Sequence, residues 1–96
     1  MAELLDDISR QLAKDFKERS SEAHEILKMF LTDYPNVPEI IRVCRCAVYM
    51  AQGDLDKLLE ALSIAQADYR DLIAAAEYKD WPANPVRVRN FTQPFP

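Results

Sequence analysis

The sequence predicts an all-α protein from three observations. Glycine occurs only once in 96 residues, at Gly53, whereas β-sandwiches and barrels need many tight turns that glycine forms most easily. Alanine, leucine and straight-chain charged residues, which are good helix formers, dominate the composition. Apolar residues recur at helical spacing from residue 4 to residue 78. We therefore expect a compact bundle of four to five helices over residues 1–80.

The first apolar stripe, within residues 3–33, allows two interpretations. Residues 3–19 form one amphipathic pattern, and Ser20-Ser21 could cap a second helix. The step from Phe16 to Ala23 keeps the stripe in phase, however, so one helix of roughly thirty residues is the alternative. We favour a break at the serines.

Residues 38–66 predict a central antiparallel helical hairpin. Pro38 suits the first position of a helix, and the helix that follows is apolar almost all round, as is typical of a central helix. The run is rich in β-branched residues, so a buried strand is the alternative. Gly53 can end this helix in a left-handed conformation, and Asp54 can cap the next one across a short connection.

The chain closes with a fifth helix and a proline-rich tail. Asp68 is expected to cap the fifth helix, whose pattern stops after Tyr78. Residues 81–96 hold four of the six prolines, two arginines and no acid, so we expect an extended segment. Burying a large apolar side chain is worth roughly 1.5–3 kcal/mol, and we expect this segment to be a strap on the bundle or on a second subunit. Its candidate interface residues are Trp81, Arg87, Arg89, Phe91 and Phe95.

Alternation in the tail predicts which side chains face the protein. Val86 and Val88 are expected to face one way, as apolar anchors, while Arg87 and Arg89 face the other way and meet acids of the fourth and fifth helices.

The net charge and the hydropathy of the chain argue against two classes of partner, nucleic acids and membranes. The formal net charge of −4 disfavours nucleic acid, which requires a clustered basic surface. No apolar run approaches the ~20 residues of a membrane span, and acids stand where a signal peptide needs a basic start. We expect a cytoplasmic protein with free thiols and neither a membrane nor a nucleic-acid partner.

The cysteines, the histidine and the acids show no spacing that predicts a catalytic or metal site. Cys44 and Cys46 would point about 200° apart on a helix, and His24 is the only histidine, so no metal or cofactor is expected. We expect Cys44 in the core, Cys46 partly buried and His24 on a solvated face. The acids of the second half, Glu77 among them, are interpreted as caps, dipole partners or exposed helix positions.

Arg42, Arg45 and Tyr49 form the candidate binding site. They are the polar group on the most apolar helix, at spacings of three and four. Burying two guanidinium groups without partners would cost several kcal/mol, so we expect them to pair with acids, for instance on the first or fifth helix. The alternative is contact with an anion or an acidic peptide, which suits arginine's planar fork.

Two functions follow from these observations. The first is a small acidic, non-catalytic protein-interaction or regulatory module that forms a homodimer, with a different protein as a second possible partner. The alternative is a small ligand-binding domain or enzyme with an anion-contacting site around Arg42 and Arg45.

Overall fold

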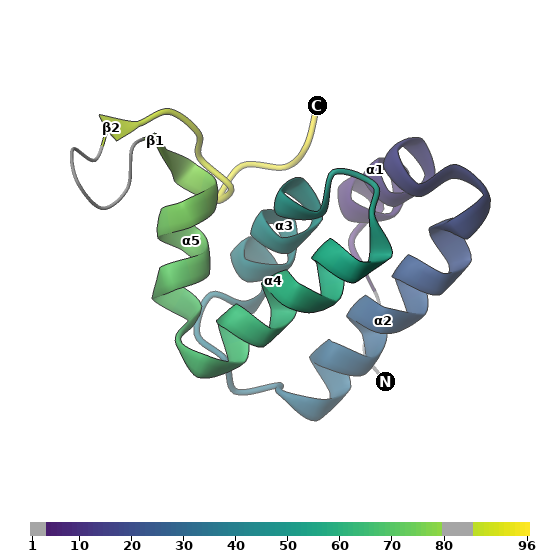
Figure 1. Ribbon diagram of the computed structural model, residues 1–96, viewed down its shortest axis with the longest axis horizontal. Helices are drawn as coiled ribbons and strands as arrows, with labels where there is room; N and C mark the ends of the chain where they lie inside the picture. Colours follow the sequence, from purple (N-terminus) through teal and green to yellow (C-terminus); the bar gives the residue numbers. More distant parts are fainter. Residues whose placement is uncertain (1–3, 80–85) are drawn as a thin grey trace.

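Five α-helices follow one another along the described part of the chain, and the C-terminal segment adds none (Figure 1). The computed structural model describes residues 4–79 and 86–96. The Cα radius of gyration, 12.5 Å, is that of a compact domain of this length. The elements are α1 (Asp6–Phe16), a 3₁₀ turn (Lys17–Arg19), α2 (Ser20–Asp33), α3 (Ile40–Ala51), α4 (Leu55–Ala67), α5 (Tyr69–Glu77), β1 (Tyr78–Lys79) and β2 (Val86–Arg87). A compact, mostly helical fold is thus confirmed, with one short antiparallel strand pair that was not predicted.

The break between α1 and α2 exists, but the serines do not make it. Lys17 leaves the helical region, with φ 51° and ψ −114°, and its N–H donates to the carbonyl of Ala13. Ser20 is already the first helical residue of α2, and no side chain caps that helix. The single long helix is therefore wrong, and the change of direction is a backbone feature of Lys17.

Helix α3 is the centre of the core. It packs against α1, α4 and α5, and the strand alternative is wrong. The helix starts at Ile40 and not at Pro38, because Glu39 adopts a left-handed φ of 52°. Its fully buried side chains come from nearly every side of the helix: Val43, Cys44, Cys46, Ala47, Val48 and Ala51.

The connection between α3 and α4 requires its glycine. Gly53 has φ +80°, and a Cβ atom there would lie 2.4 Å from the carbonyl oxygen of Asp15 on α1. Gln52 is already left-handed, so the turn takes two such residues. Asp54 then caps α4 by accepting the N–H of Asp56 and Lys57, which confirms the predicted cap. Asp68 caps α5 in the same way.

The C-terminal segment, residues 86–96, crosses α3 and ends near α1 (Figure 1). Phe91 joins the core at 8% exposure, and Phe95 packs against it. The predicted direction of the valines is wrong, since Val86 and Val88 are 52% and 47% exposed. Side chains alternate along this extended segment. Because those of Arg87 and Arg89 contact the bundle, those of Val86 and Val88 point to solvent.

Candidate functional site

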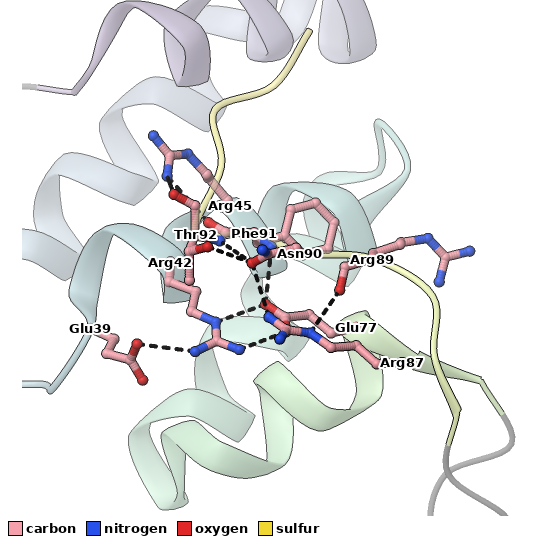
Figure 2. A network of polar contacts seen from close by, with 9 residues as sticks. All are labelled: Glu39, Arg42, Arg45, Glu77, Arg87, Arg89, Asn90, Phe91 and Thr92. Carbon is pink, nitrogen blue, oxygen red and sulfur yellow. Dashed lines mark hydrogen bonds and ion pairs between the residues drawn. The ribbon is translucent and has the colours of Figure 1, made fainter.

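The carboxylate of Glu77 is the centre of a polar network at the end of α5 (Figure 2). Its side chain has no exposed surface. Arg42 donates to both of its oxygens, from Nη2 to Oε1 at 2.6 Å and from Nε to Oε2 at 2.7 Å. Arg87 reaches Oε1 from Nε at 3.1 Å, and the N–H of Phe91 donates to Oε2 at 3.0 Å. One carboxylate therefore joins α3, α5 and the C-terminal segment.

The pKa of Glu77 is lowered despite this burial. Burial alone favours the neutral acid, but the hydrogen bonds from Arg42 and the Phe91 N–H, with the charges of Arg42 and Arg87, outweigh it. The same contact raises the pKa of Arg42, which also donates to Glu39 at 3.0 Å. Glu77 is thus ionised at neutral pH, and its carboxylate lies between two arginines.

A second carboxylate, Asp7 of α1, repeats the arrangement on the other side of α3. Arg45 donates from Nε to its Oδ2 at 2.9 Å, and the N–H of Phe95 donates to the same oxygen at 3.1 Å. Burial opposes ionisation here too, but the hydrogen bonds from Arg45 and the Phe95 N–H leave the pKa of Asp7 lowered. Arg45 also donates to the carbonyl of Phe91 at 3.2 Å.

The two halves share one design. In each, an arginine of α3 orients a carboxylate from a flanking helix, and that carboxylate accepts the backbone N–H of a phenylalanine in the C-terminal segment. The arginines are one helical turn apart, and the phenylalanines are four residues apart. These backbone hydrogen bonds to charged acceptors fix the register of the segment on the bundle.

Tyr49 forms the apolar floor beneath this segment. Its ring lies 5.3 Å from that of Phe91, centroid to centroid, and the guanidinium of Arg89 sits 4.5 Å above it. Phe95 continues the cluster at 5.9 Å from Phe91. Arg89 also donates to the carbonyl of Ala76 at 3.3 Å, so a cation–π contact with Tyr49 and a hydrogen bond to Ala76 both hold its side chain.

The structure thus brings most of the predicted site residues together. Arg42 and Arg45 pair with acids of the fifth and first helices, which confirms that expectation. Arg87 meets Glu77 of α5, and no contact links it to an acid of α4 within the described residues. Trp81 lies outside the described residues. Sequence reasoning missed Glu77, which was interpreted as an ordinary helix acid and is the most buried charged group described.

Among the described residues, no hydrogen bond joins the thiols or the histidine to this network. Both cysteines are fully buried, so the expectation that Cys46 is only partly buried is wrong. Burial raises the pKa of each thiol to about 12, which suppresses the reactive thiolate. His24 is half-buried, not solvated, with Nε2 3.4 Å from the hydroxyl of Ser9. Over residues 4–79 and 86–96, no group of three or more histidine, cysteine or acidic side chains could hold a metal ion.

An open groove of about 600 Å³ runs along the start of α3. Its apolar lining comes from just before α1, from the connection before α3 and from the first residues of α3: Leu5, Val37, Ile40 and Ile41. Glu39, Arg42, Arg45 and Thr92 complete the lining. We call the four apolar residues the α3 face.

Among the described residues, no helix combines the length and apolar character needed to cross a membrane. Comparison with protein-family models, with curated proteins and with solved structures finds no match for this chain.

Proposed function

We propose that this chain is a small acidic, cytoplasmic protein-interaction or regulatory module without catalytic activity, and that it forms a homodimer. The free, buried thiols suit a reducing compartment. In this proposal residues 38–66 act as a central antiparallel hairpin and residues 81–96 as a strap over the bundle. The main support for the homodimer is the partly exposed apolar groove lined by the α3 face.

The pairing of the arginines argues for this proposal over an anion site. Arg42 is matched by Glu77 and Glu39, and Arg45 by Asp7, at 2.6 to 3.0 Å. An incoming phosphate or carboxylate would have to displace one of these acids and leave it uncompensated. A ligand-binding or catalytic role around Arg42 and Arg45 therefore has weaker support.

The α3 face is unusual for the start of a helix. First turns often carry acids that suit the helix dipole, but α3 has none there and instead presents Ile40 and Ile41, both half-buried. Leu5 adds a side chain that is 45% exposed. The groove gathers these partly exposed apolar side chains on one side of the molecule, and apolar patches rimmed by polar residues are found at interaction sites.

The charges at its edge favour a second copy as the occupant. Glu39 and Arg42 form an ion pair in the groove lining at 3.0 Å, and Arg45 is paired with Asp7, so the charges of the groove are compensated although the chain carries −4. A two-fold contact sets the same patch of both copies together. A balanced patch can meet itself without repulsion, and each copy offers both an acid and a base for exchange across the axis.

Sedimentation equilibrium of the purified chain and of a Leu5→Lys variant tests the proposal. We expect the natural chain to have about twice the 11.1 kDa of one copy, and the variant to dissociate at least tenfold more readily, since it places like charges in a two-fold contact. Leu59→Lys changes a similarly exposed leucine on α4, at 50% against 45% for Leu5; it is the matched control and should remain dimeric.

Two results would overturn the homodimer. One is a monomeric natural chain at about 100 µM, far above the micromolar Kd expected of a functional dimer. The other is a Leu5→Lys variant that keeps the dimer mass while its circular dichroism shows that it is folded.

A further inference from the structure

A second apolar surface lies between α2 and α4, away from the C-terminal segment. The two helices lie side by side (Figure 1), and a groove of about 270 Å³ opens between their first turns. We call it the α2–α4 groove; it is lined by Arg19, Glu22, Ile26, Asp54, Leu55, Asp56 and Leu59.

Its apolar floor extends along both helices. Ile26 and Leu55 are half-buried, while Leu59 is 50% exposed. Met29 lies outside the groove lining but one turn beyond Ile26 on the same side of α2, and at 62% it is the most exposed large apolar residue described. The groove and Met29 together offer apolar contacts over about two helical turns.

The rim of this surface is acidic. Within the groove, the acids Glu22, Asp54 and Asp56 face a single base, Arg19, which is already paired with Glu22 at 2.9 Å. Helical spacing adds exposed acids along the same helices, namely Asp33, four residues after Met29, and Glu60, four after Asp56. Unlike the α3 face, this surface cannot meet a second copy of itself without repulsion.

We propose that the α2–α4 groove binds a basic amphipathic helix of a different protein. Such a helix presents apolar side chains at i, i+3, i+4 and i+7, which fit a two-helix groove, and its lysines or arginines would meet the acidic rim. The charge complementarity decides the occupant, because it excludes a second acidic chain and favours a cationic one. The inference rests on the proposed role as an interaction module, but not on the homodimer.

Binding of two matched peptides tests this inference. One fluorescently labelled 18-residue helix has leucine at the four apolar positions of each two turns and lysine elsewhere, and its counterpart replaces every lysine by glutamate. Anisotropy titrations should show the lysine peptide binding at least tenfold more tightly than the glutamate peptide. Affinity for the lysine peptide should fall as salt is raised.

Protein variants locate the binding surface. Met29→Lys and Leu59→Lys should each weaken binding of the lysine peptide at least tenfold, and Asp56→Asn combined with Glu60→Gln should weaken it by several-fold. Val88→Lys, which changes an exposed apolar residue of the C-terminal segment, should leave binding unchanged. All five substituted residues are exposed, so these four variants should remain folded by circular dichroism.

Three outcomes would overturn the inference. These are equal binding of the two peptides, equal binding by the Leu59→Lys and Val88→Lys proteins, and a change of protein mass caused by Met29→Lys, which would make a second copy the occupant. The Leu5→Lys variant separates the two proposals. If it is monomeric and still binds the lysine peptide, the groove acts independently of the dimer.

Discussion

At the scale of single residues, Glu77 determines how the arginines of α3 are used. Taking a carboxylate out of water costs several kcal/mol even after relaxation, and this side chain has no exposed surface. Arg42, Arg87 and the N–H of Phe91 offset that cost. The network therefore fixes geometry more than it adds net stability, but removing one member leaves the others buried without a partner.

We expect Glu77→Gln to lower the free energy of unfolding by about 3–5 kcal/mol, the usual cost of breaking a buried ion pair. The neutral amide cannot balance the positive charge of the Arg42 guanidinium. Its NH₂ group would also face N–H groups that donate hydrogen bonds to the carboxylate in the natural protein. Urea denaturation followed by circular dichroism measures the change. Glu60→Gln, at an exposed position of α4, should stay within about 0.5 kcal/mol. A loss below about 1 kcal/mol for Glu77→Gln would contradict this role.

The pairing of the arginines could be predicted, but the identity of the central acid could not. Two charges on an apolar helix must find partners, whatever the fold. Glu77, however, stands in the sequence like any acid at a helix end, and its partners are 35, 10 and 14 residues away. Only the packing of α5 on α3 brings them together.

At the scale of elements, the two aspartate caps could be predicted because their cause is local, although the serine cap and the helix start at Pro38 were predicted on local grounds and are wrong. Asp54 and Asp68 cap their helices through N–H groups two or three residues away, so the sequence carries the whole interaction. The break at Lys17 leaves the apolar stripe in phase on both sides, so periodicity could not locate it. The alternation of valine and arginine in residues 86–89 predicts that the two residue types point to opposite sides of the segment. It does not predict which of the two sides contacts the bundle.

The orientation of the C-terminal segment can be tested with a pair of truncations. Phe91→Ala should lower the free energy of unfolding by about 3 kcal/mol or more, because it removes a ring that is 8% exposed from the core. Val88→Ala, at 47% exposure, should cost less than about 0.5 kcal/mol. Thermal and urea unfolding of both variants measure the difference. Similar losses, or a larger loss for Val88→Ala, would contradict the observed register.

At the scale of the whole molecule, two carboxylates connect regions that are far apart in the sequence. Asp7 joins α1 to α3 and to Phe95, 88 residues away, while Glu77 joins α5 to α3 and to Phe91. Both must be ionised to accept these hydrogen bonds while balancing an arginine. The stability of the molecule should therefore depend on pH in the range where these groups take up protons.

The sign of this dependence follows from the lowered pKa values of Asp7 and Glu77. Unfolding returns both groups to ordinary values of 3.8 and 4.5, so the unfolded chain binds more protons in the acid range and stability rises with pH there. We expect the free energy of unfolding to be nearly constant from about pH 7 to 5 and to fall steadily below about pH 5. Urea titrations at a series of pH values measure this curve.

Two variants separate the buried carboxylates from the exposed ones. The combination of Asp7→Asn and Glu77→Gln should be less stable at pH 7 and should show a much flatter curve, because the two groups whose proton uptake drives the fall are absent. The pKa of Glu22 is also lowered, by its hydrogen bond with Arg19, but that pair is exposed and screened by solvent. Glu22→Gln should therefore retain the full acid sensitivity. An equally steep curve in the double variant would show that the acid sensitivity arises elsewhere in the molecule.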